Sequence, residues 1–215
     1  MSAKVAPARA PGRVLVIGAG GHAKVVIEAL RAAGFDPLGL VDARPDAPAL
    51  LGVPVLGADD ALPRLRAEGV EAAVVALGDN QARERAGRGL RALGFRLPAL
   101  VHPAALVSPS ARVGEGAVVM ARAVAGTLAE IGALAILNTG CIVEHDGRIG
   151  ACAHVAPGAA LAGAVRVGER ALVGVGAAAR PGVRIGADAV IGAGAAVVAD
   201  VAPGATVGGV PARPL

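Results

Sequence analysis

The sequence predicts two parts of different architecture, an α/β unit over residues 13–100 and an all-β solenoid over residues 101–215. In the first part, short apolar runs alternate with segments whose apolar residues have helical spacing, and a glycine-rich loop follows the first run. In the second part, an aliphatic or alanine side chain returns at every sixth residue. A strict period of six is typical of a solenoid, because neither a helix nor an ordinary strand repeats at that interval. Residues 1–12 are expected to form a flexible tail.

The α/β unit begins with a predicted strand at Val14–Ile17. Helical spacing follows from Ala23 to Ala33, then a strand at Leu38–Val41, a strand at Ala73–Leu77 and a helix from Gln81 to Leu93. Strands that alternate with helices in this way predict a mostly parallel sheet of the Rossmann-like, nucleotide-binding type.

The loop after the first strand carries Gly18, Gly20 and Ala23, and Asp42 ends the second strand, which matches the dinucleotide-binding fingerprint. Glycine lets the backbone approach a phosphate, and the helix N-terminus supplies free N–H groups. The unit is about half the size of a full dinucleotide domain, which favours a nucleoside diphosphate. A tight turn without a ligand is the alternative.

Further binding candidates lie in this loop and after the third strand. His22 and Lys24 are expected to contact a phosphate, with helix capping as the alternative role for His22. The remaining candidates are Gly21, Gly78, Asp79 and Asn80.

The solenoid is defined by seventeen positions that are expected to point inward. They are Val101, Val107, Val113, Val119, Ala125, Ile131, Leu137, Val143, Ile149, Val155, Leu161, Val167, Val173, Ala179, Ile185, Ile191 and Val197. Alanine stands four residues later in twelve of the seventeen hexads, and glycine often follows the large residue. Three hexads make one coil of a three-sided helix, so residues eighteen apart should stack at about 4.8 Å.

Polar residues interrupt this apolar repeat at Asn138 and at Glu144, His145 and Asp146. The stacking places Gly163 one coil above His145, which leaves room for a thin ligand beside the imidazole. Either flanking carboxylate can accept a hydrogen bond from Nδ1–H and free Nε2 as a general base. Backbone N–H groups near Gly163 are candidates for an oxyanion site. A solvated charged turn is the alternative.

The other histidines of the repeat are less informative. His154 cannot lie in the column of His145; it is expected to contact a ligand or to meet His145 of a neighbouring subunit, with a passive surface role as the alternative. His102 is expected to lie on the surface. No pair of histidines has close ligand spacing, so we expect no metal site.

Composition narrows the classes of function. The net charge of +4 is spread along the chain and the only aromatic residues are two phenylalanines, which argues against nucleic-acid binding. Small anionic ligands such as nucleotides or coenzyme A fit better. Cys141 and Cys152 lack metal or redox spacing and are expected to be small core residues in a reducing cytosol. Residues 1–12 lack the apolar core of a signal peptide, so we expect a cytoplasmic protein without a membrane segment.

Several ordered motifs together carry a resemblance to a known family. They are G-A-G-G-H-A-K (Gly18–Lys24), A-L-G-D-N (Ala76–Asn80), V-H-P-A-A-L-V-S-P-S-A (Val101–Ala111), L-N-T-G-C-I-V-E-H-D (Leu137–Asp146) and G-V-P-A-R (Gly209–Arg213). The chain resembles bacterial nucleotide-sugar acetyltransferases of the left-handed β-helix class. The nearest are the N-acetyltransferases that act on 4-amino-4,6-dideoxy sugars carried on UDP or GDP, including the perosamine type, and it is also similar to sialic acid O-acetyltransferases.

The resemblance implies a homotrimer of left-handed parallel β-helices with acetyl-CoA bound between neighbours. It implies His145 as the general base, Asn138 as a neighbouring active-site amide and His154 as a residue near the acetyl group. Gly163, Gly174 and Arg213 are the other implied acetyl-CoA contacts. The implied nucleotide-sugar contacts are Gly18, Gly20, Gly21, His22, Ala23, Lys24, Asp42, Gly78, Asp79 and Asn80. One departure affects the acceptor pocket: relatives often carry Asn-Ala where this chain has Gly126-Thr127.

We therefore expect direct acetyl transfer from acetyl-CoA to a sugar amine, with no covalent enzyme intermediate and no metal. The alternatives are O-acetylation of sialic acid or another sugar, an NAD-dependent oxidoreductase and a purely structural solenoid. The likeness leans toward GDP-perosamine, but the sequence leaves open UDP against GDP and the identity of the sugar.

Overall fold

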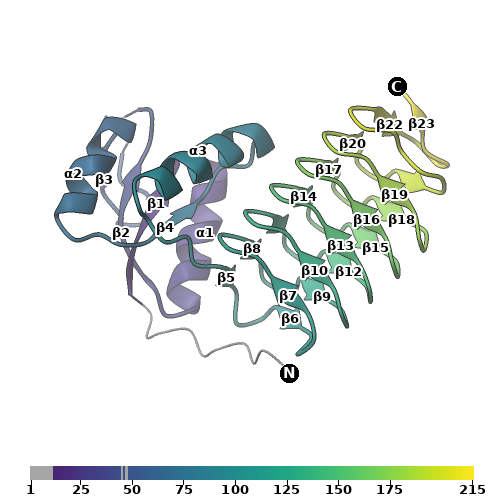
Figure 1. Cartoon of the computed structure of the whole chain (residues 1–215), viewed down its shortest axis with the longest axis horizontal. Coiled ribbons are helices and arrows are strands. Elements are labelled where there is room, and N and C mark those ends of the chain that lie inside the picture. Colours follow the sequence, from purple (N-terminus) through teal and green to yellow (C-terminus); the bar gives the residue numbers. More distant parts are fainter. Residues whose placement is uncertain (1–11, 45, 47) are drawn as a thin grey trace.

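The computed structural model describes residues 12–44, 46 and 48–215. Apart from Gly12, the expected tail lies outside the described residues. The α/β unit lies at one end of the molecule, and the stacked coils of the solenoid run away from it to the C-terminus (Figure 1).

The α/β unit contains a four-stranded parallel sheet in the order β3-β2-β1-β4. Its elements are β1 (Arg13–Ile17), α1 (Gly21–Ala32), β2 (Asp36–Val41), β3 (Val55–Gly57), the 3-10 turn η1 (Asp59–Ala61), α2 (Leu62–Ala67), β4 (Ala73–Val75) and α3 (Asn80–Ala92). The three predicted strands and two predicted helices are present. The short elements β3, η1 and α2 were not predicted, because segments of three to six residues are too short to display a period.

The solenoid consists of two-residue strands that succeed one another at every sixth residue. They are β5 (Leu100–Val101), β6 (Leu106–Val107), β7 (Arg112–Val113), β8 (Val118–Val119), β9 (Val124–Ala125), β10 (Glu130–Ile131), β11 (Ile136–Leu137), β12 (Ile142–Val143), β13 (Arg148–Ile149), β14 (His154–Val155), β15 (Ala160–Leu161), β16 (Arg166–Val167), β17 (Leu172–Val173), β18 (Ala178–Ala179), β19 (Arg184–Ile185), β20 (Val190–Ile191) and β21 (Ala196–Val197). The chain ends with β22 (Thr206–Gly208) and β23 (Arg213–Pro214).

Three sheets form the sides of the left-handed β-helix. Face A contains β5, β8, β11, β14, β17, β20, β22 and β23; face B contains β6, β9, β12, β15, β18 and β21; face C contains β7, β10, β13, β16 and β19. Paired residues on neighbouring strands from β5 to β21 are eighteen apart, as in Ile136 with His154 and Ile142 with Ala160, and the last coil is shorter, since Val190 of β20 pairs with Thr206 of β22. The predicted stacking of three hexads per coil is confirmed.

The large residue of each hexad fills the interior of the prism. Val155, Val173 and Ile191 are at most 1% exposed, and only the positions of the first coil are partly buried. The glycine that follows the large residue is required by the coil stacked on it: a Cβ on Gly132 would lie 2.6 Å from the backbone nitrogen of Ala151. Backbone contact from one coil to the next therefore explains this glycine.

One corner of the prism, between faces C and A, carries the α/β unit. Leu134, Cys152, Arg170 and Asp188 occupy equivalent turn positions of four successive coils there and have φ between 55° and 57°. We call these four residues the docking corner. A left-handed conformation costs a non-glycine residue about 1 kcal/mol or more, and here it directs side chains outward toward α3.

Cys152 corrects one expectation. It does not fill the prism, as Cys141 does, but packs with Leu134, Leu90 and Phe95 between the two parts of the molecule. Cys152 occupies a turn position of the coil, and this position directs its side chain away from the interior of the prism. The number of residues that separates it from the preceding large residue does not decide that direction alone.

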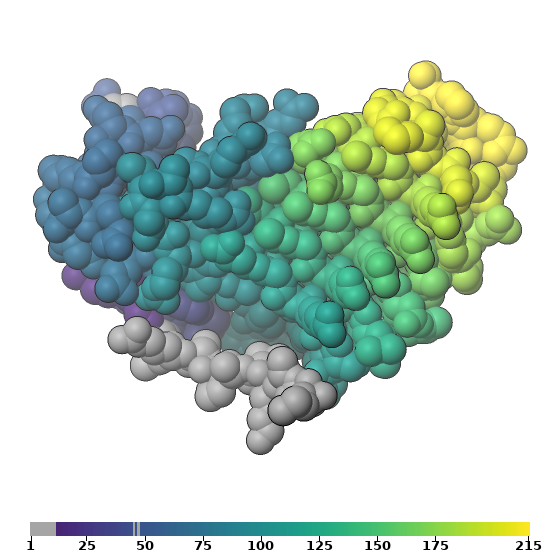
Figure 2. Space-filling model, in the orientation of Figure 1, coloured from purple at the N-terminus to yellow at the C-terminus, as the bar shows by residue number. Residues whose placement is uncertain are grey.

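The α/β unit contacts the first coils and leaves the last coils free, as the space-filling view shows (Figure 2). Within the described residues, no helix combines the length and the apolar character that a bilayer crossing requires.

Candidate functional site

The turn that follows β12 carries Glu144, His145 and Asp146 at the corner between faces B and C. Asp146 adopts φ 59°, and its carboxylate lies 2.9 Å from Nδ1 of His145. Glu144 accepts a hydrogen bond from the backbone N–H of His145 at 3.2 Å rather than from its ring. Of the two carboxylates that the sequence left open, Asp146 is the one that contacts the imidazole.

The imidazole of His145 packs against Gly163 of the next coil, as the stacking predicts, but the ring itself fills the space beside the glycine that was expected to admit a thin ligand. A Cβ at Gly163 would collide with Nε2 of the ring. The side chain of His145 is 61% exposed, and Nε2 has no hydrogen-bond partner among the residues that the structure describes. The backbone N–H of Gly163 is likewise without a partner there. A free base and a free N–H donor therefore lie on adjacent coils.

The hydrogen bond that the Asp146 carboxylate accepts raises the pKa of His145; burial acts in the opposite direction, and the charges of Asp146 and Glu144 add to the upward shift. If Asp146 accepts from Nδ1–H, the lone pair of the neutral ring lies on Nε2.

A groove of about 510 Å³ separates the α/β unit from face A. Residues 78–81 line one side of it, and His154, Leu172, Gly174 and the turn residues of face A line the other. We call it the junction groove. It brings together two sets of residues that the sequence assigned to different ligands.

Asn138 and His154 form a pair beside the junction groove. The side-chain amide nitrogen of Asn138 lies 3.0 Å from Nε2 of His154, and its oxygen accepts from Thr139 N–H at 2.8 Å. Burial lowers the pKa of His154 to about 4, with contributions from the charge of Arg83 and from His22, while the backbone of Gly78 acts in the opposite direction. His154 is therefore neutral at physiological pH.

Asn138 lies before β12 and His145 after it, so the structure places them at different corners of the prism. Within one chain it does not bring Asn138 or His154 to the base. His154 is half-covered by the α/β unit rather than freely exposed.

His22, in the first turn of α1, points its ring into the protein. Its Nε2 is buried without a hydrogen-bond partner, and burial and the charge of Arg83 lower the pKa of His22 to about 4. It does not cap the helix, since the N-cap position of α1 is Gly20 and no side chain accepts a capping hydrogen bond there.

A second pocket, of about 640 Å³, lies at the carboxyl ends of β1, β2 and β4, and Gly18, Asp42, Leu77 and Arg85 are among its lining residues. Parallel α/β sheets bind ligands at this edge, where the strand order reverses between β1 and β4. Gly18 has φ 109°, and a Cβ there would lie 2.8 Å from Leu77. A Cβ on Gly20 or Gly21 would meet nothing within 4 Å, so the loop is open to a ligand.

The carboxylate of Asp42 organises this loop. It accepts hydrogen bonds from Ala19 N–H at 2.7 Å and from the backbone and side chain of Arg44. These bonds lower the pKa of Asp42 although burial opposes the shift. Ala23 is fully buried under the loop, and Lys24 is exposed on the first turn of α1.

The remaining predicted residues have structural contacts of their own. Asp79 caps α3 by accepting from Ala82 N–H at 2.7 Å. Gly174 borders the junction groove, and a Cβ there would lie 2.5 Å from the carbonyl oxygen of Ile191 on the next coil. Arg213 is exposed on β23, several coils beyond His145.

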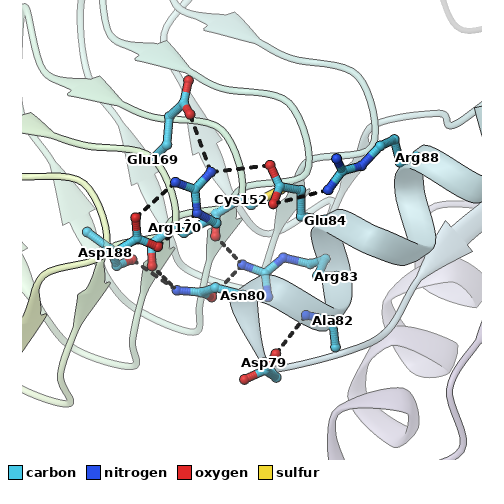
Figure 3. A network of polar contacts seen from close by, with 11 residues as sticks. Asp79, Asn80, Ala82, Arg83, Glu84, Arg88, Cys152, Glu169, Arg170 and Asp188 are labelled. Carbon is cyan, nitrogen blue, oxygen red and sulfur yellow. Dashed lines mark hydrogen bonds and ion pairs between the residues drawn. The ribbon is translucent and has the colours of Figure 1, made fainter. Parts of the chain in front are cut away.

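A polar network at the docking corner was not predicted from the sequence (Figure 3). Arg83 is only 1% exposed, and Arg170 binds Asp188 through two hydrogen bonds of 2.8 and 2.9 Å and reaches Glu84 of α3 at 3.2 Å. The eighteen-residue interval between Arg170 and Asp188 was an available signal, but nothing in the sequence identified the corner that meets α3. No cluster of metal-ligating side chains occurs within the described ranges.

Comparison with known proteins identifies the family. Residues 13–89 match the model of the PglD N-terminal domain. A perosamine N-acetyltransferase from Caulobacter crescentus, solved as a histidine variant with CoA and GDP-perosamine, is 52% identical with a TM-score of 0.93, covering 95% of this chain and 97% of that one.

Two further solved structures are also similar to this chain over nearly its whole length. The acetyltransferase domain of PglB from Neisseria gonorrhoeae FA1090, in complex with acetyl coenzyme A, is 41% identical with a TM-score of 0.89, covering 94% of this chain and 98% of that one. WeeI from Acinetobacter baumannii AYE is 26% identical with a TM-score of 0.84, covering 95% and 100%. With these likenesses extending over both the α/β unit and the coils, the chain belongs to the nucleotide-sugar acyltransferases of the left-handed β-helix class.

Proposed function

We propose that this enzyme transfers the acetyl group of acetyl-CoA to the 4-amino group of a nucleotide-linked 4-amino-4,6-dideoxy sugar, with His145 as the general base. The observation that carries the proposal is the arrangement of His145, whose ring is held by Asp146 and whose free Nε2 lies over Gly163. The 52% identity to a protein solved with GDP-perosamine favours GDP as the nucleotide and perosamine as the sugar.

The reaction follows from this geometry. The sugar amine attacks the thioester carbonyl, and its nitrogen becomes acidic as the C–N bond forms. Nε2 of His145 accepts that proton, and the Asp146 carboxylate stabilises the imidazolium. The N–H of Gly163 donates to the oxyanion before the C–S bond breaks and the thiolate of CoA leaves. Cys141 lies inside the prism, where burial raises the pKa of its thiol to about 12, so no covalent acyl-cysteine is involved.

Residues 13–100 bind the nucleotide in this proposal, and residues 101–215 carry the acetyl transfer. The open loop at Gly18, Gly20 and Gly21 receives the diphosphate at the N-terminus of α1, a helix of 12 residues without an acidic side chain in its first turn. Lys24, Asp42 and the segment Gly78–Asn80 complete the nucleotide-sugar site; the ring of His22, predicted to contact a phosphate, points into the protein instead. The pantetheine arm passes Gly163 of one chain and His154 and Gly174 of its neighbour, and Arg213 contacts the distal part of acetyl-CoA.

We propose a homotrimer in which His145 of one chain faces the junction groove of its neighbour. Two observations support it. His145 and the Asn138–His154 pair lie at different corners of one chain. Face B also exposes a column of apolar side chains, in which Leu106 is 63% and Ile142 is 36% exposed. Burial of such a column against a second copy is the usual source of a stable symmetric interface.

A thiol-release assay with acetyl-CoA tests the function. The acceptors are GDP- and UDP-linked 4-amino-4,6-dideoxy sugars, each with its 4-hydroxy analogue as the matched control. We expect thiol release with a GDP-linked amino sugar and none above background with its hydroxy analogue. Equal release from the two analogues would establish O-acetylation instead, and no release with any acceptor would refute acetyl transfer to these sugars.

A further inference from the structure

A buried arginine joins the two halves of the molecule. Arg83 lies on α3, and all five N–H groups of its guanidinium are engaged. No carboxylate accepts from it among the residues described; its acceptors are backbone carbonyls and the side chain of Asn80. Burial lowers the pKa of Arg83 to about 10, so the group remains charged at neutral pH.

The acceptors fall into two sets on opposite sides of the junction. Within the α/β unit, Arg83 donates to Leu77 O at 2.9 Å, to Gly78 O at 3.1 Å and to Asn80 Oδ1 at 2.6 Å. Within the β-helix, it donates to Leu134 O at 2.8 Å and Cys152 O at 2.6 Å. A planar fork with five donors can serve both sets at once, whereas a lysine has three donors at one point.

Each set leads directly to the junction groove. Gly78 and Asn80 line one wall of the groove. On the β-helix side, Cys152 stands two residues before His154, which lines the opposite wall. The guanidinium therefore fixes the two walls relative to each other.

Helix α3 fits against the docking corner closely enough to make this link rigid (Figure 3). Asn80 donates to Arg170 O at 2.7 Å and to Ala171 O at 3.2 Å. The lack of a side chain at Gly87 leaves the space that Leu134 fills, because a Cβ at Gly87 would overlap the Leu134 side chain. The charge of Arg83 also acts on both histidines beside the junction, since it lowers the pKa of His22 and of His154.

We infer that Arg83 is a positioning residue for acyl transfer, which holds the nucleotide-sugar half of the site at the distance from the acetyl half that the reaction requires. This inference rests on the proposed function. It makes Arg83 act through Gly78, Asn80 and His154, without contact to either substrate. Misplacement of bound reactants by about 1 Å can cost about 10²-fold in rate.

The test is Arg83→Lys, which keeps the charge but cannot serve both sets of acceptors. We expect kcat to fall about 10²-fold. Calorimetry should give dissociation constants for GDP-perosamine alone and for CoA alone within about threefold of wild type, because each half keeps its own contacts. Arg88→Met is the matched control: Arg88 is an exposed arginine of the same helix, 3.6 Å from Glu84, and this variant should keep kcat within about twofold.

A second measurement needs no turnover and so separates this inference from the proposed function. Hydrogen exchange of Arg83→Lys should be about tenfold faster in the peptides that carry residues 78–80 and 152–154. If wild type releases no thiol, the proposed function fails while this measurement still tests the link. If Arg83→Lys does not fold, Gly87→Ala takes its place, since it displaces α3 from Leu134 and should lower kcat with the same unchanged affinities.

Three results would overturn the inference. The first is a folded Arg83→Lys enzyme with wild-type kcat. The second is a loss of kcat matched by an equal loss of affinity for one ligand alone, which would make Arg83 a binding residue. The third is faster exchange on only one side of the junction.

Discussion

At the scale of single residues, the proposed mechanism gives separate roles to His145 and to its neighbours in the stack. Asp146 follows the histidine directly and reaches its ring because the turn adopts a left-handed conformation at Asp146. Gly163 lies on the next coil, and its lack of a side chain leaves space for the ring of His145. Nδ1 of the imidazole is thus held by Asp146, and Nε2 is free. Proton transfer by a general base requires such a positioned ring with a free nitrogen.

Replacement of His145 by alanine tests the base. His145→Ala should lower kcat/KM by about 10²- to 10⁴-fold, the usual contribution of a general base. The fold should be unaffected because the side chain is 61% exposed and outside the prism. Thiol-release kinetics give the rate and thermal unfolding is the control. Near-wild-type turnover would remove His145 from the mechanism.

The role of Asp146 predicts a change in pH dependence. A raised pKa keeps His145 protonated, and therefore inactive as a base, up to a higher pH than an unperturbed imidazole. Asp146→Asn removes the charge and should move the acid limb of the kcat/KM profile to lower pH, with a lower maximal rate because the imidazolium loses its partner. An acid limb that stays in place or moves upward would contradict this assignment.

At the scale of elements, the interior position of each hexad determines stability. Val173 is 1% exposed in a core of aliphatic side chains. Val173→Asp should destabilise the enzyme on the order of 4 kcal/mol or more, because it buries an unpaired carboxyl group. Val198→Asp, at a residue 41% exposed, is the matched control and should change stability by less than about 1 kcal/mol. Chemical denaturation measures both, and equal midpoints would refute the register.

The same scale explains what could be predicted from the sequence. The hexad register and the stacking of coils depend on residues at fixed intervals, and so does the contact of Gly163 with His145. The sequence pattern is therefore sufficient to predict all three. β3 and α2 are too short for such a pattern. Arg83 could not be recognised, because its β-helix acceptors are carbonyls of residues 51 to 69 positions away, brought close only by the docking of α3. Cys152 was misassigned for the same reason: the docked unit covers a turn that would otherwise face solvent.

At the scale of the whole molecule, one chain presents the turn that carries His145 and its junction groove in different places. The α/β unit covers the corner between faces C and A, while His145 occupies the corner between faces B and C. A site assembled from both therefore requires a second copy, and the exposed apolar column of face B offers a surface on which that copy can pack.

Mixed trimers test this arrangement. His145→Ala and His154→Ala, each of low activity alone, should regain activity when unfolded together and refolded as a mixture. With equal amounts, about a quarter of the sites receive an intact His145 from one chain and an intact His154 from the next, so thiol release should reach about a quarter of wild type. No recovery in confirmed mixed trimers would place both histidines in a site within one chain.

The coil of eighteen residues has a consequence for how this enzyme can vary in length. A coil shortened at a turn can still keep its face continuous, since Val190 of β20 pairs with Thr206 of β22 only sixteen residues later. Removal or duplication of one full coil preserves all corners and changes only the length of the β-helix, by about 4.8 Å. A whole coil is therefore the unit by which this β-helix can grow or shrink while every turn keeps its length.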